Sequence, residues 1–277
     1  MQNKNFRSAL MLSCHNEKHL NKIPSLDADC IMLNLEDGVS EEKKPLALKL
    51  CCEALEKYTN VEKLLVVRVN SLDEGGVEEI EKLNSYKPDA FRVPKIRTVE
   101  DVELALELID DSIGLHLSIE TKEAWLNLKE LAKNKRVTTL YLGILDLLAD
   151  LKLPHSLIEI SNPTIEYILT HFLITSHAIG VKPVSFVFQE YKNESKFAEW
   201  LELESRIGFS AKGCISPSQV IMVNKAFGIS KTELRRAEEI VKAFELNSKN
   251  GITGFVHEKY GFIDEPIYKG ALNQIKR

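Results

Sequence analysis

Acidic and basic side chains stand directly after several short apolar runs of this 277-residue chain. They are Glu36 with Asp37, Arg68 with Asn70, Lys95, Glu120 and Asp146. Carboxylates from separate runs, with no thiolate or imidazole between them, suit a hard cation such as Mg2+. An arginine beside such a metal would hold a substrate carboxylate or stabilise a developing oxyanion. These residue types therefore point to carbon–carbon bond formation or cleavage next to a 2-oxo acid, through a metal-stabilised enolate.

The side chains can converge only if the apolar runs are strands of one parallel sheet. Eight near-continuous apolar runs predict such strands, because parallel strands are covered on both faces. They span residues 7–13, 30–35, 64–70, 90–95, 115–120, 139–143, 183–188 and 212–216. Apolar residues at helical spacing predict helices over 98–109, 123–135, 164–179 and 195–207. The first of these opens with a capping box, and the last two end at glycines.

The spacing of the strand ends sets the fold class. The polar residues that close six strands are Asp37, Asn70, Lys95, Glu120, Asp146 and Glu190, which are 33, 25, 25, 26 and 44 residues apart. Most of these gaps fit one βα unit of about 30 residues. Eight such units with right-handed crossovers close into an α/β protein of the (β/α)8 TIM-barrel type, whose active sites lie at the C-terminal strand ends. A doubly wound open sheet is the alternative, but no glycine-rich turn follows the first strand.

The pattern changes after Phe227. A charged helix is predicted from Ser230 to about Asn247, followed by a glycine-containing segment over 251–261 and a short helix after Pro266. This tail cannot add a ninth strand to a closed barrel. We therefore expect a catalytic barrel domain over residues 1–228 and a C-terminal extension over 229–277, packed outside the barrel or at a subunit interface.

The net charge indicates which partners the protein can bind, and the cysteines indicate its compartment. The formal net charge is −5, and Lys and Arg form no block, which argues against nucleic acid and anionic membranes as partners. The longest weakly polar stretch, over 167–181, is interrupted by histidines and hydroxyl residues and predicts a buried helix. Five scattered cysteines without a CxxC motif predict reduced core thiols in a cytoplasmic protein.

A series of short motifs runs through nearly the whole chain. They are Leu33-Asn34-Leu35-Glu36-Asp37, Arg68-Val69-Asn70, Pro94-Lys95, Ile119-Glu120-Thr121, Gly143-Ile144-Leu145-Asp146, Gly208-Phe209, Ile215-Ser216-Pro217-Ser218-Gln219 and Gly261-Phe262-Ile263-Asp264. Any one of them is weak, but the ordered set resembles the HpcH/HpaI aldolase/citrate lyase family. The tail motif makes the chain look more like the citrate lyase beta subunit and malyl-CoA lyase branch than the shorter aldolases.

The resemblance implies a TIM barrel that uses Mg2+ to cleave or form 3-hydroxyacyl-CoA thioesters, in a homotrimer or a multiple of trimers. It implies that Glu120 and Asp146 bind the metal. Arg68 would hold the carboxylate and enolate oxygen of the 2-oxo acid. Asp264 would act as acid or base, supplied across a subunit interface.

The resemblance also suggests roles for neighbouring residues. Glu36 and Asp37 match acids that lie near the metal's water molecules. We assign Asn70, Lys95 and Arg7 to substrate binding together with Arg68. Lys95 could instead form a Schiff base with a carbonyl substrate, although no sequence feature shows its amine to be desolvated.

Three departures from the family's pattern leave other hypotheses open. Asn34 stands where the family usually has Asp, and Ser216 where it usually has His. The Pro-Gly-x-Arg-Pro stretch that helps to bind CoA in the family is replaced by residues 13–17, Ser-Cys-His-Asn-Glu. One alternative is therefore a CoA-independent aldolase that acts on a free acid. The other is a catalytically degenerate barrel that serves as a binding or scaffold subunit.

Overall fold

Eight parallel strands form one sheet in the order β7-β6-β5-β4-β3-β2-β1-β8. Strands β1 to β8 are Ser8–Ser13, Cys30–Asn34, Leu64–Arg68, Ala90–Val93, Gly114–Ile119, Val137–Leu142, Lys182–Val184 and Lys212–Cys214. A parallel bridge between Ser185 and Lys212 connects the two edges. The sheet is thus a nearly closed barrel, which confirms the predicted (β/α)8 class and excludes the open sheet.

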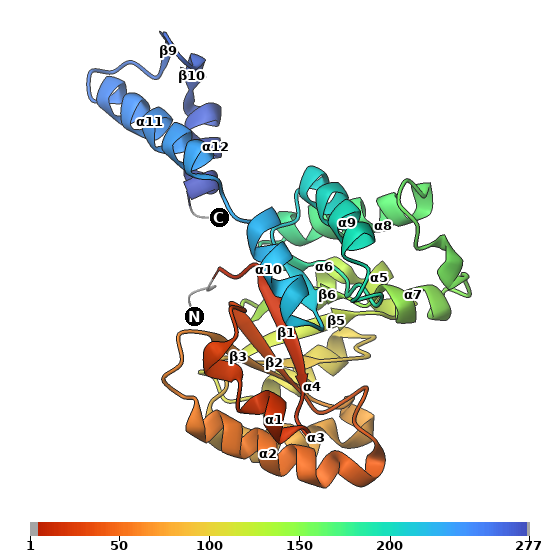
Figure 1. Cartoon of the computed structure of the whole chain (residues 1–277). Coiled ribbons are helices and arrows are strands. Elements are labelled where there is room, and N and C mark those ends of the chain that lie inside the picture. Colours follow the sequence, from red (N-terminus) through yellow and green to blue (C-terminus); the bar gives the residue numbers. More distant parts are fainter. Residues whose placement is uncertain (1–4, 276–277) are drawn as a thin grey trace. The chain divides into compact units, whose positions relative to one another are not determined.

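This arrangement comes from a computed structural model that describes residues 5–275. The chain divides into two compact units, Met1–Phe227 and Gly228–Arg277. The barrel forms the larger unit (Figure 1). None of the helices within the described residues is long and apolar enough to cross a membrane.

Helices connect the strands of the barrel. In chain order, α1 to α10 are Glu17–Leu20, Lys44–Lys57, Val77–Leu83, Val99–Leu108, Lys122–Leu126, Leu128–Leu131, Ile144–Asp150, Pro163–Ala178, Glu194–Ile207 and Pro217–Ala226. Thr98 and Asp101 form the predicted capping box of α4. The single helix predicted over 123–135 is wrong, because Asn127 leaves the helical conformation and separates α5 from α6.

The barrel strands have two buried faces. Successive side chains of a strand point to opposite faces. One cluster, which includes Ala9, Met32, Val66, Ala90 and Tyr141, fills the barrel interior. A larger cluster packs the outer faces of the strands against the helices. All five cysteines are buried free thiols, as predicted.

The smaller unit has its own core. Helix α11 (Lys231–Ser248) is followed by an antiparallel hairpin of β9 (Gly254–His257) and β10 (Gly261–Asp264), and then by α12 (Glu265–Ile275). Its core consists of Ala237, Ile240, Phe244, Ile263 and Ala271. Both helices agree with the prediction, whereas the hairpin in the glycine-containing segment was not predicted.

Candidate active site

Arg68 is the buried cation at the end of β3. It shares the interior face of that strand with Val66, because the two residues are two positions apart. Its Nη2 donates to Asp37 Oδ2 at 2.9 Å and forms an ion pair with Glu36 Oε2. Glu36 is buried, whereas the side chain of Asp37 is 68% exposed. The structure therefore brings three predicted site residues together. The buried Glu36 holds the Arg68 guanidinium in its orientation, while Asp37 contacts it from the solvent-exposed loop.

The charge of Arg68 responds to both predicted metal ligands. Burial, and then the nearby Arg92 guanidinium, lower the pKa of Arg68 to about 9, while Glu120 and Asp146 act to raise it. Both carboxylates therefore lie within electrostatic reach of this guanidinium. Arg68 Nε and Glu36 Oε1 are buried without a hydrogen-bond partner among the described residues. One hydrogen-bond donor and one acceptor at this site are thus left for a bound ligand.

Glu120 is held in place from two sides. It follows β5, and its Oε1 accepts a hydrogen bond from the Lys95 amide at 2.7 Å. On the other side it touches Gly143: a Cβ at position 143 would stand 2.6 Å from Glu120 Oε2. Only a glycine leaves room for the carboxylate in this position.

Asp146 provides a second carboxylate from the next strand connection. It lies in the first turn of α7, directly after β6, and is exposed. No group of three or more His, Cys, Asp or Glu within residues 5–275 could hold a metal. A pair of carboxylates nevertheless fits Mg2+, which typically uses one or two protein carboxylates and fills its remaining positions with water and substrate oxygens.

Asn34 and Asn70 stabilise the loops around Arg68. Asn34 Nδ2 donates to the Asp37 carbonyl at 2.7 Å and so braces the loop that carries both acids. The amide nitrogen and Nδ2 of Asn70 donate to the two carboxylate oxygens of Glu79, at 2.7 and 2.5 Å. Burial raises the pKa of Glu79. Glu79 was not predicted from the sequence, because an acid in the charged pattern of α3 looks like a solvated helix residue.

Lys95 contributes through its backbone. Its side chain is 47% exposed, and its Nζ lies 3.2 Å from Glu74 Oε2. The hydrogen bond with Glu74 raises the pKa of Lys95, so the amine stays protonated at neutral pH. The exposed amine, paired with Glu74, thus gives no support to the Schiff-base alternative, which needs a neutral amine.

Arg7 lies at the other end of the barrel. It precedes β1, and its Nε and Nη2 bind both carboxylate oxygens of Asp29 at 2.9 Å, just before β2 begins. Since the strands are parallel, this is the N-terminal end of the sheet, opposite to Glu120 and Arg68. The assignment of Arg7 to substrate binding is therefore corrected to a structural role.

Asp264 and Ser216 both act as helix caps in this structure. Asp264 ends β10, and its Oδ1 accepts a hydrogen bond from the Ile267 amide at 3.1 Å in the first turn of α12. Ser216 caps α10 by accepting from the Gln219 amide. The acid–base role of Asp264 remains a prediction.

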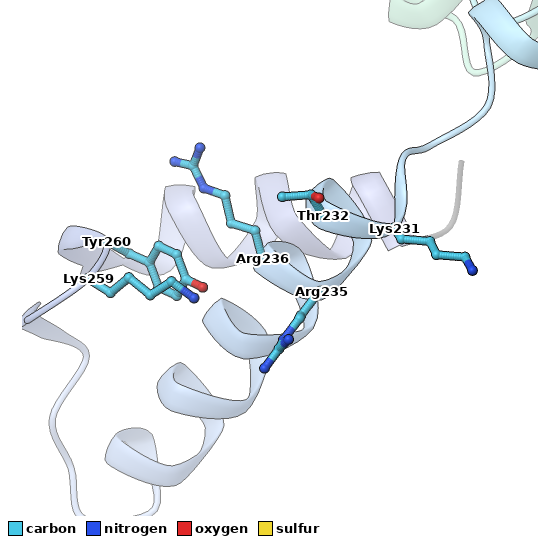
Figure 2. Close-up of a pocket in the computed structure, with 6 residues that line it drawn as sticks. All are labelled: Lys231, Thr232, Arg235, Arg236, Lys259 and Tyr260. Atoms are coloured by element: carbon cyan, nitrogen blue, oxygen red, sulfur yellow. The ribbon is translucent and has the colours of Figure 1, made fainter.

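The smaller unit contains a separate, positively charged cavity. Its volume is about 710 Å3, and its lining residues are Lys231, Thr232, Arg235, Arg236, Lys259 and Tyr260. Figure 2 shows that the lining comes from α11 and from the turn between the hairpin strands. Glu239 accepts from Arg235 Nε at 2.9 Å and from Lys259 Nζ at 3.0 Å, which stabilises this turn against the helix. None of the predicted site residues lines this cavity.

Known proteins resemble the chain over most of its length. A (3S)-malyl-CoA thioesterase of Cereibacter sphaeroides is 30% identical over 247 residues, which cover 89% of this chain and 85% of that protein. The mitochondrial citramalyl-CoA lyase of Rattus norvegicus is 27% identical, over 96% of this chain and 84% of its own. The citrate lyase subunit beta of Leuconostoc mesenteroides subsp. cremoris is 27% identical, over 100% and 94%.

Solved structures and a family profile agree with these relatives. The crystal structure of CitE from Mycobacterium tuberculosis, in complex with magnesium, acetoacetate and coenzyme A, has a TM-score of 0.77 at 22% identity. It covers 99% of this chain and 98% of that one, and supports the fold. The profile described as HpcH/HpaI aldolase/citrate lyase matches residues 7–217. The chain belongs to the HpcH/HpaI aldolase/citrate lyase family.

Proposed function

We propose that this protein is a Mg2+-dependent carbon–carbon lyase that cleaves or forms a 3-hydroxyacyl-CoA thioester. The observation that carries the proposal is the buried Arg68 at the end of the barrel, whose charge is stabilised by Glu120 and Asp146. Relatives named citramalyl-CoA lyase and citrate lyase subunit beta support the reaction class. The CitE complex with magnesium, acetoacetate and coenzyme A supports the choice of ligands.

Glu120 and Asp146 are the residues that would hold Mg2+. When bound, the metal would act as a Lewis acid toward the carbonyl or hydroxyl oxygen of the 2-oxo acid part. The Lys95 amide and the space left by Gly143 keep the Glu120 carboxylate oriented before substrate arrives. Such fixed orientation is what metal ligands require from their surroundings.

Arg68 would bind the carboxylate of the 2-oxo acid. Its orientation is set by the buried Glu36, whereas the exposed Asp37 can be displaced by an incoming carboxylate. In the cleavage direction the 3-hydroxyl loses its proton and the C2–C3 bond breaks. The electron pair remains on C2 as the thioester enolate, which is then protonated. Asp264 is our candidate for the group that moves these protons.

Hydrolysis of the thioester is a second candidate function. It is favoured by the relatives named (3S)-malyl-CoA thioesterase, which are 30% identical to this chain. The two reactions break different bonds. The lyase reaction leaves the C–S bond intact and releases a 2-oxo acid, while the thioesterase reaction adds water across the C–S bond and releases CoA thiol.

The products separate the two candidates. Purified protein with Mg2+ is incubated separately with (3S)-malyl-CoA, (3S)-citramalyl-CoA and citryl-CoA, the last of which would release a 2-oxo acid with a second carboxylate. Both 2-oxo acid and free thiol are assayed. We expect 2-oxo acid without thiol, lost in Glu120→Gln and retained in Glu107→Gln, a charge-neutralising change on the exposed face of α4. Thiol without 2-oxo acid would replace the lyase by the thioesterase. The corresponding free hydroxy acids are assayed in parallel. Turnover of these acids without turnover of the thioesters would favour the CoA-independent aldolase. Absence of any turnover would favour the scaffold subunit.

A further inference from the structure

A second guanidinium lies beside Arg68 inside the barrel. Arg92 in β4 is the direct register partner of Arg68 in β3. It follows Ala90 of the interior cluster by two positions, so its side chain also points into the barrel. Arg92 is 7% exposed and Arg68 is 6% exposed. Both arginines are therefore buried to a similar extent.

The Arg92 side chain is fixed in orientation. Its Nε donates to Ser118 Oγ at 2.8 Å, and its guanidinium carbon lies 4.3 Å from the centre of the Tyr141 ring. A hydrogen bond at Nε and a ring against one face leave the terminal Nη groups as the remaining donors. A planar guanidinium held in this way is suited to bidentate binding of a carboxylate.

Arg92 lacks the close carboxylates that surround Arg68. Arg68 has ion pairs with Glu36 and Asp37, whereas Arg92 forms no ion pair within the described part of the chain. Burial lowers the pKa of Arg92, and Glu120 offsets this only in part. A buried charge without a close partner is costly. A ligand carboxylate at this position would supply the missing partner.

Strand β5, which pairs with β4 on the side away from Arg68, adds no further positive charge beside Arg92. His116 in β5 is the register partner of Arg92. Burial, and then Arg92 itself, lower the pKa of His116 to about 3, so the imidazole is neutral at physiological pH. The charge next to Arg68 at this level therefore comes from Arg92.

We propose that Arg92 binds a second carboxylate of the substrate's 2-oxo acid part. Arg68 would bind the carboxylate next to the reacting carbonyl, and Arg92 the one at the far end. The acid would then be a 2-oxo dicarboxylate, in contrast to a monocarboxylate such as pyruvate or glyoxylate. This inference rests on the proposed function, because it places the 2-oxo acid at Arg68.

A matched pair of stable ligands tests the proposal. Lactate and malate are both 2-hydroxy acids, and malate differs only by a second carboxylate on the carbon that is the methyl group of lactate. Each is titrated calorimetrically into the full-length protein with Mg2+. We expect wild-type protein to bind malate at least about tenfold more tightly than lactate, since a charged hydrogen bond typically has that effect. In Arg92→Met the difference should fall below about threefold while lactate binding is unchanged, and Arg92→Lys should regain part of it.

The controls separate failure of this proposal from failure of the proposed function. Arg206→Met, in the last turn of α9, removes an arginine outside the barrel interior and should keep the malate preference. Two results would overturn the role of Arg92 and leave the proposed function standing. One is equal Mg2+-dependent binding of both acids by wild-type protein, and the other is a full malate preference in a folded Arg92→Met variant. Absence of Mg2+-dependent binding of either acid would overturn both proposals. The wild-type comparison needs no variant and holds even if Arg92→Met does not fold.

Discussion

Glu120 lies against the backbone of Gly143, with its Cβ and its Oε2 each 2.6 Å from the point where a Cβ of residue 143 would stand. Gly143→Ala should therefore displace the Glu120 side chain. Because disturbing the support of a metal ligand typically costs 10- to 100-fold in affinity, we expect Mg2+-dependent oxalate binding to weaken by at least about tenfold. Gly270→Ala in α12 is the control, since a Cβ there meets no atom within 4 Å. Undiminished binding in Gly143→Ala would contradict the role of Glu120.

The barrel could be predicted because its signals are local. Apolar runs and their spacing define strands whatever surrounds them. The predicted strand ends were too late at Asn70 and Lys95. At these positions the backbone leaves the sheet: the Asn70 amide binds Glu79 and the Lys95 amide binds Glu120. Contacts of this kind are long-range side-chain interactions that no local pattern records.

The convergence of the candidate residues was predictable in part for the same reason. Glu120, Asp146 and Arg68 stand at strand ends, and parallel strands bring such ends together. Arg92 gave a weaker signal, as one charged residue within a buried strand, and its meaning depends on Arg68 in the next strand. Arg7 stands at the start of the first predicted strand, so its position in the sequence already indicated the N-terminal end of the barrel, away from the site.

The proposed role of Asp264 across a subunit interface can be tested by mixing inactive proteins. Asp264→Asn should reduce lyase turnover by at least about 100-fold, as loss of a proton-transfer group does. Arg68→Ala should reduce it by a similar factor, as loss of a charge-stabilising donor does. If Asp264 serves a neighbouring subunit, mixed oligomers should regain part of the activity. Subunit exchange is verified with two distinguishable tags. Exchange without any recovery of turnover would refute a shared site.

The ion pair between Lys212 and Glu204 should be important for stability. Lys212 Nζ lies 2.5 Å from Glu204 Oε1, and both side chains are fully buried. Burial raises the pKa of Glu204 and lowers that of Lys212, so each charge depends on the other. Lys212→Met should lower the free energy of unfolding by about 3–5 kcal/mol, because it leaves the buried Glu204 carboxylate without its cation.

The double variant is the matched control for this pair. Lys212→Met with Glu204→Leu removes both charges and should lose less stability than Lys212→Met alone. Urea unfolding of the three proteins measures the difference. A double variant that is less stable than the single one would show that the hydrogen bond from Ser185 to Glu204, at 2.6 Å, matters more than the ion pair.

His116 should make stability depend on pH. Burial lowers its folded-state pKa from 6.5 to about 3. Below pH 6.5 the unfolded chain therefore binds a proton that the folded protein does not, and stability falls as the pH decreases toward 3. At pH 5.5 the loss should be about 1.4 kcal/mol relative to pH 7.5. Urea unfolding at both values should show a smaller change in His116→Gln, and an equal change would contradict the buried neutral imidazole.

The central claim is that Glu120 and Asp146 form a working metal site beside Arg68. Oxalate, whose adjacent oxygens mimic those by which a 2-oxo acid would bind the metal, is titrated calorimetrically into protein with Mg2+ and into EDTA-treated protein. We expect binding that requires Mg2+, is weakened at least about tenfold in Glu120→Gln and Asp146→Asn, and is retained in Glu107→Gln. Oxalate binding that survives EDTA treatment or both carboxylate substitutions would contradict the claim, and no binding by folded wild-type protein would favour the degenerate barrel.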